Sequence, residues 1–227
     1  MIRIETVVLD MAGTTVTDDG LVQGAFERAW DRLHADLGAQ RRADAVAHVI
    51  ATMGQSKIEV FRGLVDEEAA QALNIAFETA LDELVAAGAV APIAGAETAI
   101  RTLKDEGRSV ALTTGFSRGT ADAILRALGW EDLPDHVFTP ADAGRGRPSP
   151  GMNLLAAVRT GVPTVEALAV VGDAESDARS GVNAGAGLVA AVLTGGHATE
   201  EALRAAGAQH VLPSISDLPA LLGQLGR

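Results

Sequence analysis

The chain has 227 residues and 48% apolar residues, which suffices for a domain of ordinary size with a smaller inserted one. A net charge of −12 argues against nucleic-acid binding, which needs clustered Lys and Arg, and the absence of cysteine removes disulfides and thiolate sites. No apolar run approaches the roughly 18 residues of a membrane span, and the first residues are too charged for a signal peptide, so we expect a soluble, cytoplasmic protein with no membrane or nucleic-acid partner.

The first predicted element is a buried strand, Val7 to Leu9, that leads into the carboxylate Asp10. The small residues at positions 12–15 follow directly, and a loop without bulk lets backbone N–H groups approach an anion closely. In an open parallel sheet, ligands bind at the carboxyl ends of the strands. Asp10 is therefore a candidate nucleophile or metal ligand. The alternative for such an Asp, taken alone, is a turn former or a helix N-cap.

An all-helical insert is predicted next. Apolar side chains recur at helical spacing between Phe26 and Leu37 and again between Leu73 and Leu84, and shorter helices are expected at 43–50 and 57–65. The stretch from Gly88 to Gly95 has the glycine and proline of a return linker. We therefore expect a helical domain at 17–90, inserted into a core formed by 1–16 and 91–227.

From residue 96 onward the predicted elements alternate. Helices are expected at 96–106, 119–128, 151–160, 176–184 and 200–206, and strands at 109–113, 136–139, 168–173, 188–193 and 210–212. Such alternation is typical of a parallel sheet with helices on both faces. The fold class is thus α/β, with a Rossmann-like core and an inserted helical domain.

Two of the predicted strand-end loops carry groups suited to a phosphate. Thr114 and Gly115 end the strand at 109–113, where a hydroxyl and a backbone N–H can hold a phosphate oxygen. Arg147 lies between glycine and proline just before a helix, and its guanidinium can bridge phosphate and carboxylate with bidentate geometry. The alternatives are an ordinary strand-end threonine with a turn glycine, and a solvated basic loop.

A second pair of acids follows another strand. Asp173 ends that strand, and Asp177 comes four residues later at the start of a helix. Either could be only an N-cap. Together with Asp10 they suggest a site for a hard cation, because Mg²⁺ takes one or two carboxylates, waters and substrate phosphate oxygens.

These pieces, in this order, resemble the haloacid dehalogenase superfamily of aspartyl-phosphate hydrolases: DxxGT at 10–14, a strand-end Thr, a basic residue before Pro, and GDxxxD at 172–177. The resemblance covers essentially the whole chain, with the helical insert where that superfamily places its C1 cap. It implies Asp10 as nucleophile and Thr114 and Arg147 as further catalytic groups. It also implies Mg²⁺ held by Asp10, the loop carbonyl at Ala12, Asp173 and Asp177, and phosphate held by Gly13, Thr14, Thr114, Gly115 and Arg147.

Two departures narrow the resemblance. Most phosphatases of the superfamily have a second Asp at the position of Ala12 and a lysine at that of Arg147; here both loops resemble those of the phosphonoacetaldehyde hydrolases, or phosphonatases. The segment from Met53 to Arg62 is similar to the phosphonatase cap segment, in which a lysine in the register of Lys57 forms a Schiff base with the substrate aldehyde. The resemblance of this segment also implies that Met53 contacts the substrate.

The resemblance to the phosphonatases fails at two positions. Val60 stands where the phosphonatases have a cap histidine, and Phe116 stands where they have an aromatic hydroxyl. The alternative for Lys57 is an ordinary surface lysine on a cap helix.

The sequence therefore predicts a Mg²⁺-dependent hydrolase that acts through an aspartyl-phosphate. Its predicted reaction cleaves the C–P bond of phosphonoacetaldehyde, or of a related aldehyde phosphonate, through an imine on Lys57. One alternative is a phosphatase for small phosphomonoesters such as phosphoglycolate, and another is a non-catalytic phosphate-binding protein. The resemblance also implies a homodimer.

Overall fold

A six-stranded parallel sheet lies at the centre of the protein. The structure is a computed structural model that describes residues 3–226. Its strands are β1 (Thr6–Asp10), β2 (Ser109–Thr113), β3 (His136–Phe138), β4 (Leu168–Gly172), β5 (Leu188–Val192) and β6 (His210–Leu212). They are ordered β3-β2-β1-β4-β5-β6, and every neighbouring pair is parallel. The predicted α/β fold is confirmed, and β1, which ends in Asp10, lies between β2 and β4.

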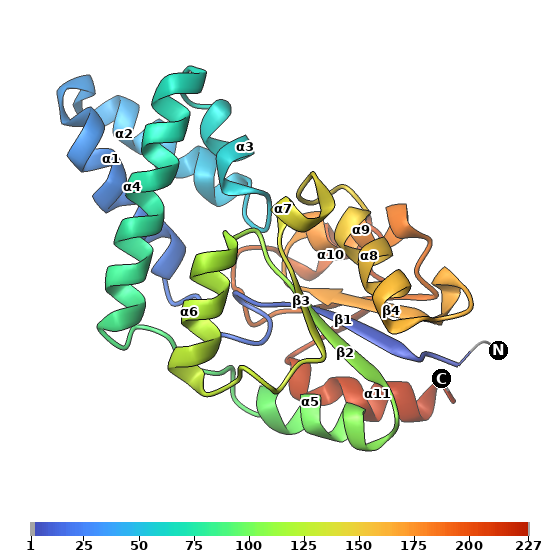
Figure 1. Cartoon of the computed structure of the whole chain (residues 1–227). Coiled ribbons are helices and arrows are strands. Elements are labelled where there is room, and N and C mark those ends of the chain that lie inside the picture. The colour runs from blue at the N-terminus through green and yellow to red at the C-terminus, as the bar shows by residue number, and fades with distance from the viewer. Residues whose placement is uncertain (1–2, 227) are drawn as a thin grey trace.

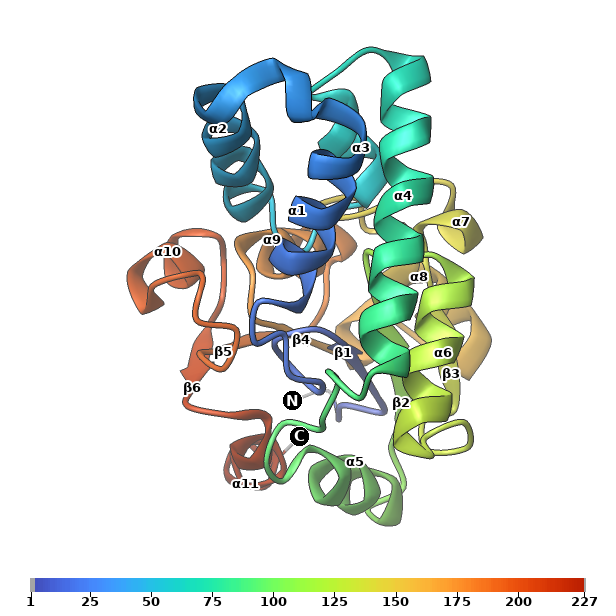
Figure 2. The same cartoon turned by 90° about the vertical axis from the view of Figure 1, so that its left-hand side faces the viewer.

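Helices cover both faces of this sheet (Figures 1 and 2). One face carries α5 (Ala96–Asp105), α6 (Arg118–Leu128) and α11 (Leu218–Gln224), and the other carries α8 (Gly151–Thr160) and α9 (Glu175–Ala184). The short helix α10 (Glu200–Ala205) precedes β6, and the single turn α7 (Pro140–Ala143) precedes α8. The strands and the helices α5, α6, α8, α9 and α10 agree with the predicted ranges to within one residue, whereas α7 and α11 were not predicted.

Four further helices pack together beyond the end of the sheet to which β1 and β4 point (Figure 1). They are α1 (Leu21–His34), α2 (Gly38–Ala51), α3 (Lys57–Arg62) and α4 (Glu67–Ala86). The predicted helix at 43–50 was too short, and the one at 57–65 extended too far. Aromatic side chains hold this part together: the ring of Phe61 lies 5.8 Å from that of Phe26 and 5.5 Å from that of Phe77.

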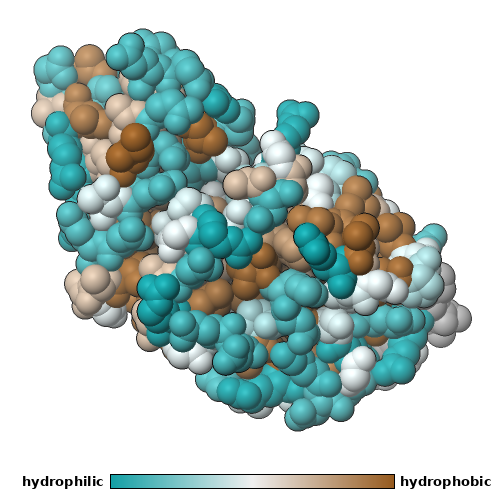
Figure 3. Space-filling model, viewed as in Figure 1, coloured by the Kyte–Doolittle hydropathy of each residue, from teal (hydrophilic) through white to brown (hydrophobic). Residues whose placement is uncertain are grey.

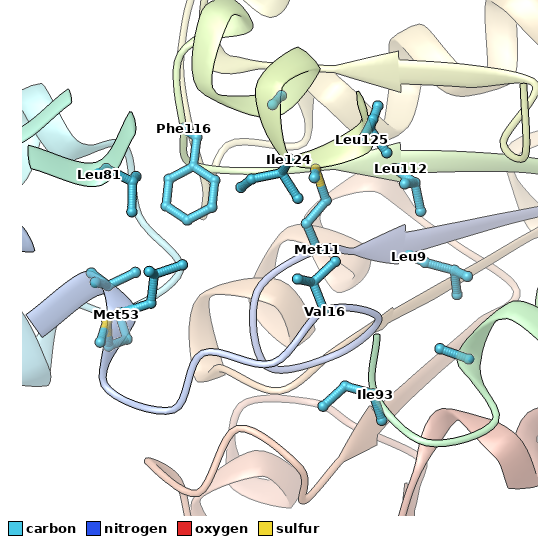
Figure 4. Close-up of a cluster of buried hydrophobic side chains, with 14 of the residues drawn as sticks. Leu9, Met11, Val16, Met53, Leu81, Ile93, Leu112, Phe116, Ile124 and Leu125 are labelled. Carbon is cyan, nitrogen blue, oxygen red and sulfur yellow. The ribbon is translucent and has the colours of Figure 1, made fainter. Parts of the chain in front are cut away.

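The chain enters and leaves these four helices at one place, because Val16 forms an isolated bridge with Pro92. We call α1 to α4 the helical cap and the rest the core, and the exact boundaries at residues 16 and 91 stay a prediction. The apolar interior runs from one part into the other (Figure 4). Leu9 of β1, Leu112 of β2 and Met11 belong to the core side of this interior. Phe116 of the core faces Leu81 of α4. The cap therefore packs directly against the core.

Each part contains one of the two tryptophans. Trp30 of α1 is buried, with its ring 4.8 Å from that of His34. Trp130, just after α6, is also buried, and its Nε1–H donates to Glu97 at 3.3 Å. The two indoles thus sit in separate surroundings.

The outer surface seen in Figure 3 is largely hydrophilic, and it is indented where the helical cap meets the core. Within residues 3–226, no helix combines the length and the apolar character needed to cross a membrane.

Candidate active site

Four loops of the core meet beneath the helical cap. Strand order explains this, because β1 pairs with β2 on one side and with β4 on the other, so that their carboxyl ends are neighbours. Asp10 lies opposite Thr113, and Asp173 directly follows β4. This is the edge at which parallel sheets bind ligands. The structure thus brings together the loops that the sequence singled out.

Arg147 connects two of the acids. Its Nη2 lies 2.5 Å from Oδ1 of Asp10, and its Nη1 lies 2.5 Å from Oδ1 of Asp177. The Arg147 side chain is 3% exposed, and its guanidinium also donates to the carbonyl of Gly54 at 3.2 Å and to Oγ1 of Thr113 at 3.3 Å. Arg147 therefore joins the end of β1, the loop after β4 and a cap loop through one planar group, as bidentate geometry allows.

Three buried carboxylates face one another. Asp10, Asp173 and Asp177 each place an oxygen within 4.8 Å of the others. Oγ1 of Thr14 donates to Asp173 at 3.0 Å, and the backbone N–H of Ala174 donates to Asp177 at 3.0 Å, so two of the acids are held in place.

These carboxylates carry more negative charge than their surroundings balance. Burial raises the pKa of Asp10 to about 7, even though Arg147 opposes the shift. Burial and the charges of Asp10 and Asp177 raise the pKa of Asp173 well above its usual range. Hard oxygen ligands with excess negative charge suit a divalent cation such as Mg²⁺. The donor set therefore fits the predicted metal, with the loop at Ala12 beside it.

Lys57 is the first residue of α3 and is buried, with 7% of its surface exposed. Burial lowers the pKa of its amine to about 8, and the charge of Arg147 adds to that effect, whereas Asp18 and Asp10 oppose it. A cation at a helix N-terminus is also unfavourable, because the helix dipole is positive there. The surface-lysine alternative is therefore wrong.

A small internal cavity of about 20 Å³ lies at the centre of the site. All four predicted catalytic residues line it, as do Ala12, Met53, Gly115 and Asp173. The wall comprises Asp10, Ala12, Asp18, Val22, Met53, Gly54, Lys57, Thr114, Gly115, Phe116, Arg147, Asp173 and His197. Such a space holds about one water. Three predicted site residues, Gly13, Thr14 and Asp177, are buried behind this wall.

A larger cleft of about 720 Å³ lies outside, in the indentation between α3 and α4 of the cap and α6 and α7 of the core. Lys57 and Arg147 line both the cleft and the internal cavity. Asp10 and Asp173 line only the smaller space.

Glycines let the cap reach this position. A Cβ on Gly115 would lie 2.5 Å from the carbonyl oxygen of Gln55, and one on Gly146 would lie 2.6 Å from Cβ of Ser56. Because contacts this short do not occur between real side chains, these positions need glycine for the cap loop at 54–56 to touch the core. The structure is therefore closed over Asp10.

The structure shows where the two residues that differ from the phosphonatases lie. Val60 is buried in the apolar interior and does not line the cavity, whereas Phe116 does. Arg62, also part of the matching segment, is exposed and pairs with Glu59 and Glu67.

Two ionisable residues on the cavity wall were not identified as site residues from the sequence. His197 lies in a glycine-rich loop after β5, and its Nε2 is 3.3 Å from Oδ2 of Asp18. Asp18 was interpreted only as part of a turn. Neither position has a local sequence signal for function, and only the tertiary fold places them beside Lys57.

Comparison with known proteins identifies the family. Residues 4–185 match the model of the haloacid dehalogenase-like hydrolases. A phosphonoacetaldehyde hydrolase of Bacillus cereus is 30% identical over 204 residues, covering 84% of this chain and 76% of the relative.

Solved structures agree on the fold. A hydrolase from Pseudomonas syringae superimposes with a TM-score of 0.85 at 23% identity, covering 97% of this chain and 99% of its own. A phosphonoacetaldehyde hydrolase-like protein from Oleispira antarctica gives a TM-score of 0.82 at 23% identity, over 99% and 93% of the two chains. With the sequence matches, the loops around Asp10 show that the chain belongs to the haloacid dehalogenase-like hydrolases.

Proposed function

We propose that this hydrolase cleaves the C–P bond of a small aldehyde phosphonate, phosphonoacetaldehyde or a close relative, through an imine on Lys57 and an aspartyl-phosphate on Asp10. The observation that carries the proposal is the buried amine of Lys57, which shares one small cavity with the nucleophile. A phosphoester mechanism has no use for such an amine. The B. cereus relative bears the name of this activity.

The imine solves the problem of a carbon leaving group. Direct cleavage of a C–P bond would expel a carbanion. When the amine of Lys57 condenses with the aldehyde, water leaves and an iminium forms, which accepts the electron pair of the breaking bond and becomes an enamine. A lysine must be partly unprotonated to react in this way, and burial provides that condition by lowering its pKa to about 8.

The phosphoryl group passes to Asp10. Its carboxylate attacks phosphorus, giving an aspartyl-phosphate that water later hydrolyses. Arg147 stabilises charge on the phosphoryl oxygens through its fork, and Thr114 and Gly115 orient the group. The carboxylates of Asp10, Asp173 and Asp177 and the loop carbonyl at Ala12 would hold Mg²⁺, which supplies charge neutralisation for the phosphoryl oxygens.

Ala12 supports a carbon leaving group. An alkoxide needs a proton, and a positioned acid contributes about 10²–10⁴-fold to such a reaction. Ala12 lines the cavity at the position where, by the resemblance, most phosphatases of the superfamily have a second Asp, and its side chain has no proton to give. An enamine leaving group needs no proton on oxygen.

A phosphatase for small phosphomonoesters is the second candidate. The arrangement of Asp10, Thr114, Arg147 and Asp173 favours it, since those groups would bind either kind of phosphoryl substrate. Cytoplasmic location and the homodimer stay predictions from the sequence.

Phosphate release from a panel of phosphonates, set beside a panel of phosphomonoesters, tests the proposal. We expect release from aldehyde phosphonates, loss of activity in Asp10→Asn, and loss in EDTA that Mg²⁺ restores. Fast release from esters alone would favour the phosphatase, and release from neither panel would favour a non-catalytic phosphate-binding protein.

Borohydride trapping tests the imine itself. Lysine occurs only at positions 57 and 104 of the chain, so peptide mass spectrometry can assign an adduct without ambiguity. Borohydride added during turnover should inactivate the enzyme with the adduct on Lys57, and Lys57→Arg should retain the fold but lose C–P cleavage. An active Lys57→Arg variant would refute the imine.

A further inference from the structure

His197 is held in a fixed orientation by Asp18. Its Nε2 lies 3.3 Å from Oδ2 of Asp18, while Oδ1 of the same carboxylate accepts the backbone N–H of Val22 at 3.0 Å. Asp18 is 7% exposed and accepts a backbone N–H from the first turn of α1, so its carboxylate cannot turn away freely. With Nε2–H donating to Asp18, the neutral ring keeps a lone pair on Nδ1 for another proton.

The ring of His197 also lies between two spaces. On one side is the internal cavity with Asp10 and Lys57. On the other is a hollow of about 200 Å³ in the outer surface, between α2 and α9. Among residues 3–226, Met53 and His197 line both spaces, and of the two only the histidine has a side chain that can carry a proton. Its side chain is 27% exposed, so it reaches solvent while the cap is closed.

Imine formation needs a group that can move a proton. The ammonium of Lys57 must lose one proton before its nitrogen can attack the aldehyde. The hydroxyl of the resulting carbinolamine must gain one proton before it leaves as water. The net reaction of ammonium and aldehyde gives iminium and water, so the same proton can serve both steps. The internal cavity of about 20 Å³ leaves little room for water, so a side chain on its wall is suited to carry this proton.

The other groups on the cavity wall are already engaged. Asp10 is needed as the nucleophile and pairs with Arg147, and Asp173 accepts from Thr14. Val60, at the position of the phosphonatase cap histidine, cannot titrate and points into the apolar interior. His197 comes from a different part of the chain, the core loop after β5, yet it reaches the same cavity.

We propose that His197 takes the proton from the Lys57 ammonium and delivers it to the carbinolamine hydroxyl, directly or through one water, with Asp18 as the residue that positions it. This inference rests on the proposed function. After C–P cleavage, His197 takes a proton from solvent through the outer hollow and gives it to the terminal carbon of the enamine, which restores an iminium. Water then releases the aldehyde product and the Lys57 ammonium, so atoms and charges balance.

Several charged groups share the two spaces beside the ring. On the inner side are Asp10, Asp18, Lys57, Arg147 and Asp173, and on the outer side are Glu175 and Arg179. A pH profile therefore needs a variant that separates His197 from these groups. Arg179→Gln provides a matched control, because this exposed arginine lines the outer hollow and pairs with Glu175 without reaching the internal cavity.

The test measures the rate of imine formation with phosphonoacetaldehyde, by borohydride trapping of Mg²⁺-loaded enzyme at short times. We expect His197→Gln to lower this rate about 100-fold or more, the range of general acid–base catalysis, and Arg179→Gln to leave it unchanged. The variant His197→Ala should regain activity with added imidazole, which can enter from the outer hollow. The recovery should follow the ionisation of imidazole as the pH is varied.

Hydrolysis of acetyl phosphate serves as a second measurement, since it needs Asp10 but no imine. We expect His197→Gln to retain it, which would show that the fold and the phosphoryl site are intact. Loss of both activities together would overturn the proton-transfer role in favour of a structural one, as would trapping at the wild-type rate. Failure of the wild-type enzyme to trap any adduct while it hydrolyses acetyl phosphate would overturn the proposed function, and this inference with it.

Discussion

The ionisation of Lys57 gives the sharpest quantitative prediction. Burial lowers the pKa of its amine from 10.5 to about 8. At pH 7 a pKa of 8 leaves about 9% of the amine unprotonated, against about 0.03% for an ordinary lysine, a difference of about 300-fold. The shift corresponds to about 3 kcal/mol against the ammonium. Because the shift is downward, the free amine should increase as the pH rises through 8 and be nearly complete by pH 9.

Competitive labelling with acetic anhydride measures this directly. Each acetylated lysine falls on one of two peptides, since the chain has only Lys57 and Lys104. Lys104 lies at the surface with its Nζ 2.9 Å from Asp135, so it is an internal reference for reagent and time. Labelling of Lys57 should rise with a midpoint near pH 8, and unfolding in urea should abolish that midpoint. A midpoint near pH 10.5 in the folded enzyme would refute the claim that burial activates this amine.

Three substitutions test other parts of the site. Arg147→Lys should lower kcat/KM for phosphonate cleavage at least about tenfold, because one ammonium cannot span the carboxylates that the guanidinium joins; unchanged steady-state kinetics would contradict this. Ala12→Asp adds an acid to the cavity wall and should raise the ratio of phosphomonoester to phosphonate turnover about 100-fold. An unchanged ratio would show that Ala12 does not indicate a carbon leaving group. Gly115→Ala places a Cβ 2.5 Å from the carbonyl oxygen of Gln55, and this variant should lose more than tenfold in kcat/KM with little change in Tm. The control variant Gly119→Ala should be neutral, because the atom nearest to its new Cβ is 3.9 Å away. Equal activity of the two variants would show that cap closure is not needed.

Much of the fold was predictable because its signals are local. Buried strands such as β1 and β4 are short apolar runs that lead directly to an Asp, and the long helices have apolar side chains at regular spacing. The helices that were missed lack this pattern. The turn α7 has four residues and is fixed by Thr139, whose backbone N–H donates to Asp142, and α11 has a proline in its first turn.

The site was predictable only in part, for a different reason. Asp10, Thr114, Arg147 and Asp173 follow strands or precede a helix, so the topology of a parallel sheet is enough to bring them together. His197 follows β5 in a loop that carries no such mark. Its contact with Asp18 joins residues 179 apart in the chain, and it depends on how the cap is seated on the core.

The separate placement of the two tryptophans makes the unfolding of this protein easy to resolve. The chain has no tyrosine, so its near-ultraviolet emission comes from the indoles alone. Trp30→Phe leaves an emission signal that reports only on the core, and Trp130→Phe leaves one that reports only on the helical cap. Since the apolar interior is continuous between the two parts, we expect the cap and the core to unfold in one transition. In each variant, the fluorescence midpoint should then equal the Tm of that variant's overall unfolding. A cap that loses its fluorescence signal well before the core does would instead be an independently folding unit, with its own cooperative transition.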